Sequence, residues 1–279
     1  MQGWRTAFLL ACAPVVVALA VAGTASQQPS TVAARTTART DFRWVARRTP
    51  NANLYALAGS AAVPLLPRLA REAENAISAN VAWLGERHVK GKLNLFFVGS
   101  RDEQRPFTGT RSMGWSIVGE GTAFFVANDS ISPAIRHETM HLLSWRLWGT
   151  PGGVWMSEGI ATAAAGGCLE WTIEEIAASL YRNRELATIG VLRRGFRTGG
   201  IQGIVHYVSA GSLLLYVDTV WGRDKLRELW RSGGLAASDR VLGVSPLELE
   251  RTWRASIARV EPPAKWSVIA REINRRGCE

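Results

Sequence analysis

Short apolar runs, each bounded by turn residues, recur in the first half of the chain. Residues 52–59 (ANLYALAG) and 92–99 (KLNLFFVG) have the length of strands, and each ends at a glycine. Residues 112–129 contain two further runs on either side of Gly-Glu-Gly at 119–121. Runs of this length between turn residues predict β-strands. We therefore expect the first half to supply strands, the last two joined by a turn.

Helical spacing of apolar residues sets the second half apart. One such segment, 63–86, falls among the strands. The later segments of this kind are 172–183, 204–222, 223–232 and 245–260. Strands first and helices afterwards predict an α+β fold.

The segment SPAIRHETMHLLSWRLWG joins the two halves and has clear helix signals at its ends. Ser132 is suited to the N-cap, Pro133 to the first helical position, and Gly149 to the end of the helix. Ser157 is suited to cap a second helix that begins at Glu158. We expect two consecutive helices here.

The N-terminus differs from the rest of the chain. Residues 7–22 form an apolar run, shorter than the roughly 20 residues of a membrane span, and small residues follow it. Residues 1–25 are therefore predicted to be a signal peptide or, if uncleaved, an N-terminal anchor. Residues 26–40 are polar without periodicity and predict a flexible linker. The folded domain is expected to span 41–279.

Removal of that leader would leave Cys168 and Cys278 as the only cysteines. An even pair in an exported chain predicts a disulfide, although two free buried thiols would give the same count. The net charge of +10 comes mainly from scattered arginines, and no nucleic-acid-binding motif accompanies them. We expect no nucleic-acid partner, and membrane contact only through an uncleaved leader.

A metal-binding pattern occurs in the central helix. His137 and His141 are four residues apart, so both imidazoles project from one helix face and are able to bind one ion. Glu138 lies about 100° round the helix, where it is able to act on a water bound to that ion. This is the H-E-x-x-H arrangement of zinc hydrolases. Two satisfied core histidines on a buried helix are the structural alternative.

A catalytic zinc usually has three protein ligands and one open position, so the motif requires a third donor. Glu158, seventeen positions after His141, is the candidate, and Gly159 beside it would let another backbone approach closely. By itself, Glu158 could simply suit the positive end of a helix dipole. Its place after the histidine pair favours the ligand role.

His137-Glu138-Thr139-Met140-His141 followed by WMSEGIA resembles the glutamate-ligand zinc metallopeptidases, the gluzincins. The resemblance covers about residues 41–266 and extends to the thermolysin-like catalytic domain and its bacterial peptidase-MA-like relatives. It implies a strand-rich N-terminal lobe, a helical C-terminal lobe and an active-site helix between them. It also implies His137, His141 and Glu158 as Zn²⁺ ligands, with Glu138 as general base.

In such families a tyrosine or histidine of the helical lobe also donates a hydrogen bond to the oxyanion of the tetrahedral intermediate. Tyr207 is the best match, and His206 is the neighbour that could replace it. The alternative for Tyr207 is a core aromatic side chain. The Gly-x-Met-Glu-Asn stretch with which aminopeptidase relatives bind a free amine is missing, and Glu120 is a poor substitute. No carboxylate follows Glu158 within two turns, so the groups that orient the histidines must come from elsewhere.

Together these features predict an exported zinc-dependent peptidase, secreted or held in the cell envelope. Its substrate, a peptide or protein, is expected to lie along the strand at 121–127. The alternative is a non-catalytic envelope protein that retains the peptidase fold and the metal as a binding or scaffolding module. A basic protein recruited to an anionic surface is a second alternative, which the scattered charge does not favour.

Overall fold

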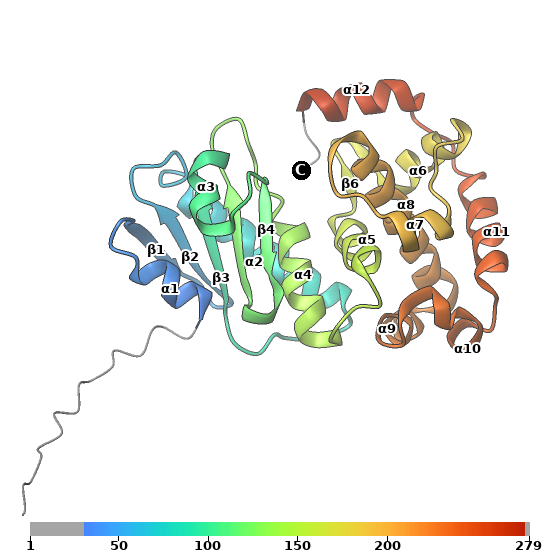
Figure 1. Cartoon of the computed structure of the whole chain (residues 1–279), viewed down its shortest axis with the longest axis horizontal. Coiled ribbons are helices and arrows are strands. Elements are labelled where there is room, and N and C mark those ends of the chain that lie inside the picture. The colour runs from blue at the N-terminus through green and yellow to red at the C-terminus, as the bar shows by residue number, and fades with distance from the viewer. Residues whose placement is uncertain (1–30, 277–279) are drawn as a thin grey trace, which may run out of the picture.

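The computed structural model describes residues 31–276, and these form a mixed α+β structure. The strands lie on one side of helix α4 (Ile135–Trp148), and most of the later helices lie on the other side (Figure 1). The α+β class predicted from the sequence is therefore confirmed. The predicted leader, residues 1–25, and the cysteine at position 278 lie outside the described residues.

One mixed sheet contains most of the strands. Its members are β1 (Trp44–Arg48), β2 (Ala52–Leu57), β3 (Leu93–Val98), β4 (Gly114–Ile117) and β5 (Thr122–Val126). The order in space is β1-β2-β3-β5-β4. Strands β2, β3 and β5 run parallel, whereas β1 and β4 are antiparallel to their neighbours and form the two edges. The predicted turn between β4 and β5 is present as a short 3-10 helix, Val118–Glu120.

The central strands are apolar on both sides because both faces of the sheet are covered. Phe97 and Phe125 stack with ring centroids 5.0 Å apart and belong to the main core. Their neighbours Phe96 and Phe124 stack at 4.9 Å on the opposite face, in a separate cluster. Alternation of side chains along a strand gives each phenylalanine pair its own core. Fully buried strands therefore appear in the sequence as continuous apolar runs.

Helices α2 (Leu66–Trp83) and α4 cover the face that carries the main core. The other face is covered by α3 (Arg101–Thr108) and α1 (Val32–Ala38). The described part of the expected flexible linker is thus partly helical. Thr31 caps α1, and the buried Ala33 packs against the outer phenylalanine cluster. Its two buried residues, Ala33 and Thr36, gave no apolar period strong enough to predict this helix.

The second half consists mainly of helices. They are α5 (Val154–Ala165), α6 (Ile173–Arg182), α7 (Ile189–Gly195), α8 (Gly200–Trp221), α9 (Arg223–Arg231), α10 (Ser238–Leu242), α11 (Pro246–Ile257) and α12 (Trp266–Arg276), with a 3-10 turn at Gly234–Ala237. The expectation of helices alone was incomplete, because β6 (Gly167–Cys168) and β7 (Trp171–Thr172) form a small hairpin. Two-residue strands are too short to give a period. Cys168 in this hairpin is buried and disulfide-bonded.

Close packing of α5 against α8 fixes the start of the helical half. A Cβ atom added at Gly159 would lie 2.8 Å from Leu214 Cδ1 and 3.0 Å from Ala210 Cβ. Only a residue without a side chain permits this approach, as the sequence suggested for Gly159. Among the described helices, α8 alone is long and apolar enough to cross a membrane, and most of it is buried inside the protein. It is therefore a core helix in this structure.

Candidate metal centre

Helix α4 begins two residues later than the sequence suggested. Its first residue is Ile135, because Ala134 has ψ 58°, outside the helical region, and no side chain caps the helix. The proposed N-cap, Ser132, therefore lies outside the helix. The error leaves the motif unchanged, since His137 and His141 both lie in the helix with ring centroids 4.8 Å apart.

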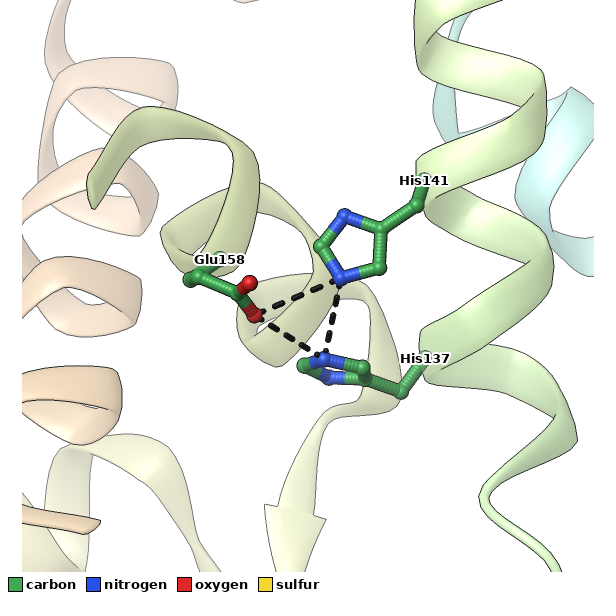
Figure 2. Close-up of side chains that lie close together, drawn as sticks. All are labelled: His137, His141 and Glu158. Carbon is green, nitrogen blue, oxygen red and sulfur yellow. Dashed lines mark hydrogen bonds and ion pairs between the residues drawn. The ribbon is translucent and has the colours of Figure 1, made fainter. Parts of the chain in front are cut away.

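Glu158 on α5 points toward both histidines (Figure 2). Its Oε2 atom lies 3.2 Å from His137 Nε2 and 3.3 Å from His141 Nε2. The two Nε2 atoms are 3.2 Å apart. The three residues predicted as ligands are thus brought together, and they form the group of described residues best placed to hold a metal ion.

The spacing of these three atoms fits zinc. Ligand atoms of a tetrahedral site with bonds of about 2.0–2.1 Å are about 3.3–3.4 Å apart, close to the separations observed here. Two nitrogen lone pairs also repel each other, so the contact between His137 Nε2 and His141 Nε2 needs a proton or a cation between them. The donor set of two imidazoles and one carboxylate suits Zn²⁺.

Hydrogen bonds and charges within the candidate site shift the pKa values of Glu158 and His141 in opposite directions. Burial opposes ionisation of Glu158, but hydrogen bonds from His137 and His141 hold the pKa of its carboxyl far below the usual range. Burial likewise lowers the pKa of His141, yet the hydrogen bond and charge of Glu158, with the charge of Glu138, raise it above its ordinary value. The site therefore holds an ionised carboxylate that attracts positive charge, as a cation site requires.

Ser157 does not cap α5, contrary to the sequence prediction. The helix begins at Val154, four residues before the predicted first residue Glu158, and it follows Gly152, where an added Cβ would lie 2.4 Å from Gly234 N. Ser157 Oγ instead lies 2.9 Å from His141 Nδ1. A hydroxyl that accepts the Nδ1 proton leaves Nε2 free to bind a metal. Ser157 thus provides the orienting group that the sequence did not reveal.

Strand β4 holds Glu138 from the side opposite the helix. Ser116 Oγ donates to Glu138 Oε2 at 2.6 Å and to the Glu138 backbone oxygen at 3.0 Å. A Cβ atom added at Gly114 would lie 2.4 Å from Glu138 Oε1, so a glycine is needed there. Gly114 and Ser116 are two residues apart and therefore face the same side of the sheet. Together they fix the carboxylate beside the candidate metal site.

Tyr207 and His206 are the two candidates for stabilising the oxyanion. Only Tyr207 is among the described residues that line the cleft at the candidate metal site. Its ring centroid is 6.0 Å from that of His137, and its hydroxyl donates to Thr198 O at 3.3 Å. His206 is buried, and its Nδ1 accepts the Arg197 N–H at 2.8 Å. Burial and the charges of Glu158 and Glu138 raise the pKa of Tyr207, which keeps the phenol protonated.

The ligands open into a cleft of about 670 Å³ between β4, α4 and the start of α5. His137, Glu138, His141 and Glu158 all line it. The described lining residues include no arginine or lysine, and these two glutamates are their only carboxylates. The cleft is large enough for several peptide residues and leaves the three candidate ligand residues accessible from one side.

One further expectation, on the strand that binds substrate, is corrected by the order of the sheet. The strand expected to bind substrate, within 121–127, is β5, which is fully buried between β3 and β4. The free edge beside the cleft belongs to β4. Glu120 accepts the Val32 N–H and lies 3.8 Å from Arg35. It is engaged with α1, which removes it as an anchor for a substrate amine.

No family model matches this chain, and no curated protein matches it at a significant level. The resemblance to the gluzincins thus remains a prediction from the motif. The arrangement of the site gives an independent basis for a proposal.

Proposed function

We propose that this protein is a zinc-dependent endopeptidase. The observation that carries the proposal is the triangle formed by His137 Nε2, His141 Nε2 and Glu158 Oε2, with sides of 3.2–3.3 Å. Its dimensions suit Zn²⁺, which these three residues would hold beside the cleft. When bound, Zn²⁺ would supply Lewis acidity, which lowers the pKa of water and polarises a carbonyl group.

Glu138 would be the general base. It lines the cleft beside the ligand triangle without belonging to it, and Ser116 holds one of its carboxylate oxygens. In this role its carboxylate takes a proton from the attacking water and later passes it to the leaving amine. A site used only to hold a metal has no need of this carboxylate, so its position favours catalysis over the scaffolding alternative.

Tyr207 would stabilise the negative charge that develops on the carbonyl oxygen in the transition state. Its phenol is protonated and lines the same cleft as the ligands. The hydroxyl now donates to Thr198 O, a long hydrogen bond of 3.3 Å. We infer that the phenol exchanges this weak acceptor for the developing oxyanion.

The free edge of β4 would align the substrate. An extended peptide is able to add as a further strand to an exposed sheet edge, with main-chain hydrogen bonds providing affinity. Gly114 and Ser116 on this strand also fix Glu138. The same strand would therefore position both the scissile bond and the general base. β4 replaces the buried strand β5 in this role.

The charges of the cleft favour cleavage within a chain over removal of terminal residues. An aminopeptidase needs a carboxylate for the free amine, and a carboxypeptidase needs a cation for the free carboxylate. The two glutamates of the described cleft are already assigned to metal and proton transfer, and no cation lines it. We therefore propose an endopeptidase.

We also propose that the protein acts outside the cytoplasm. The signal predicted at residues 1–25 is one reason. The disulfide of Cys168 is another, because such bonds persist mainly in oxidising compartments. Cys278 as its partner stays a prediction.

The test is turnover of a quenched-fluorescence peptide library by the zinc-loaded full chain and by Glu138→Gln. We expect wild-type cleavage that a chelator abolishes and zinc restores. Glu138→Gln should lose at least about a thousandfold in kcat while keeping about one equivalent of zinc, because proton transfer alone has been removed. Full activity of this variant would contradict the mechanism. Zinc binding by an inactive wild type would favour the non-catalytic module.

A further inference from the structure

Cations line a separate pocket at the ends of α2 and α4. Its volume is about 520 Å³, and Arg87, Lys90 and Arg146 are among its described lining residues. It shares no described lining residue with the cleft at the candidate metal site. Among its described lining residues, Glu86 alone carries a carboxylate, and Glu86 Oε1 lies 3.1 Å from Arg227 Nη1 of α9. The pocket therefore has an excess of positive charge.

Arg146 is a half-buried cation of this pocket without a counter-charge. Its side chain packs beside Gly121, where an added Cβ would lie 3.3 Å from Arg146 Cζ. Arg146 Nη1 donates to Lys90 O at 3.1 Å. Burial lowers the pKa of the guanidinium, and no carboxylate of the described residues offsets this effect. A charge that is partly removed from water is costly unless it is paired, so an anion bound here would stabilise Arg146.

A row of cations continues from this pocket to the edge of the sheet. Lys92 follows Lys90 by two residues, and Lys92 Nζ donates to Thr49 O at 2.5 Å. Thr49 directly follows Arg47 and Arg48, the exposed end of β1. Because consecutive Cα atoms are about 3.8 Å apart, these links keep the cations next to one another. Basic residues that are scattered in the sequence are thus gathered along one part of the surface.

The charges of this row are available to a ligand. Glu74, which lies near Lys92, accepts hydrogen bonds from Asn51 N at 2.9 Å and from Asn51 Nδ2 at 2.7 Å. Its carboxylate is therefore engaged with the backbone and side chain of one residue. Arg47, Arg48 and Arg87 form no ion pair with a described residue.

We propose that this row, from Arg146 and Arg87 through Lys90 and Lys92 to Arg48, binds a linear polymer that carries repeated phosphate groups. The inference is independent of the proposed peptidase function and gives the protein a second ligand. Arginine binds phosphate through paired hydrogen bonds, and lysine binds it as a point charge. A row of cations suits charges repeated along a chain, whereas a single small anion would need only the pocket.

The lining of the pocket favours phosphate groups over the bases of a nucleic acid. No phenylalanine, tyrosine or tryptophan is among its described lining residues, so it offers no such ring for a base to stack on. The separation of the pocket from the metal cleft would let the protein stay on the polymer while the cleft remains open.

Fluorescence anisotropy of a labelled polyphosphate chain, titrated with the full-length protein at low ionic strength, tests this site. The Arg87→Gln/Lys90→Gln variant should bind about tenfold more weakly than wild type, because two exposed ion pairs are lost. Added salt should weaken wild-type binding, since ions screen contacts to phosphate. Far-UV circular dichroism of the variant should match wild type, because both residues are exposed.

Arg259→Gln/Lys265→Gln is the matched control, because it removes the same charge from two exposed residues outside the described pocket lining. It should bind polyphosphate within about twofold of wild type. The site is disproved if wild type does not bind polyphosphate, or if the two double variants lose affinity equally, since net charge alone would then explain binding. Tighter binding of oligothymidine or of phosphatidylglycerol vesicles, at the same phosphate concentration, would overturn the proposed ligand in favour of a nucleic acid or a lipid surface.

Discussion

Glu138 is fixed by the strand opposite its own helix as well as by the helix. Ser116 donates to its carboxylate at 2.6 Å, and Gly114 leaves room for the other oxygen. General-base catalysis depends on such placement, because an error of about 1 Å is able to cost a hundredfold in rate. Two small residues of β4 thus help to place the base on which the proposed chemistry depends.

Gly114→Ala tests this placement. The new Cβ would lie 2.4 Å from Glu138 Oε1 and 2.8 Å from Cγ, so the side chain must move. We expect kcat for a peptide substrate to fall about a hundredfold, with zinc affinity within about threefold of wild type. Steady-state kinetics and zinc titration measure the two quantities.

Gly195→Ala is the control for that substitution, because an added Cβ there meets no atom within 4 Å. It should retain the wild-type kcat. A Gly114→Ala protein that cleaves at the wild-type rate would show that β4 does not position the base.

At the level of single residues, the sequence predicted the three residues of the candidate metal site but not the serines that contact them and Glu138. His137, His141 and Glu158 belong to a motif with fixed spacing, whereas Ser116 reaches Glu138 from 22 positions away. Ser157 was predicted only to cap a helix, whereas its hydroxyl lies beside His141 Nδ1. A serine has no distinctive pattern, and its partner depends on tertiary packing.

At the level of elements, the small residues of α5 determine where Glu158 is held. Gly159 permits contact between α5 and the residues Leu214 and Ala210 of α8. Helix α5 also contacts α4. The position of the third ligand is therefore set by packing between helices. A change in the α5–α8 distance should alter both stability and metal binding.

Gly159→Ala makes this change with one methyl group. We expect the free energy of unfolding to fall by about 1–3 kcal/mol, because the methyl group overfills a packed contact. Zinc affinity should fall as well, since Glu158 is the adjacent residue. Denaturant unfolding and zinc titration of the full chain provide the measurements.

Gly190→Ala is a matched helical control, where the added Cβ meets only the end of the flexible Arg194 side chain. It should be neutral or gain up to about 1 kcal/mol from helix propensity. The packing account is refuted if Gly159→Ala is as stable as wild type and binds zinc equally well.

The sequence predicted many of the longer elements but missed α12, of eleven residues, and several shorter ones. Strands β2, β3, β4 and β5 were expected from apolar runs between turn residues, helices α2, α6, α8, α9 and α11 from helical spacing, and α4 and α5 from the signals at their ends. The edge strand β1 was not predicted, because most of its residues are exposed and two of them are the charged Arg47 and Arg48. α7 and α10, of seven and five residues, are too short to show a helical period. Burial and exposure of such segments are decided by the rest of the fold.

At the level of the whole molecule, the candidate site joins the two parts of the fold. His137 and His141 belong to α4, which packs on the sheet, and Glu158 belongs to α5. Helix α5 lies in the helical part of the molecule (Figure 1). A single core cluster contains buried residues of both parts, including Leu54 of the sheet and Leu213 of α8. This shared core holds the ligands close together, so the site does not depend on a loop for its geometry.

Zinc binding by His137, His141 and Glu158 is tested most directly by a crystal structure of the zinc-loaded full chain with anomalous data at the zinc edge. We predict one strong peak about 2.0–2.2 Å from His137 Nε2, His141 Nε2 and a carboxylate oxygen of Glu158, with the fourth position facing the cleft. Zinc bound elsewhere, or a Glu158 carboxylate turned away from it, would contradict the proposed metal centre and the hydrolysis built on it.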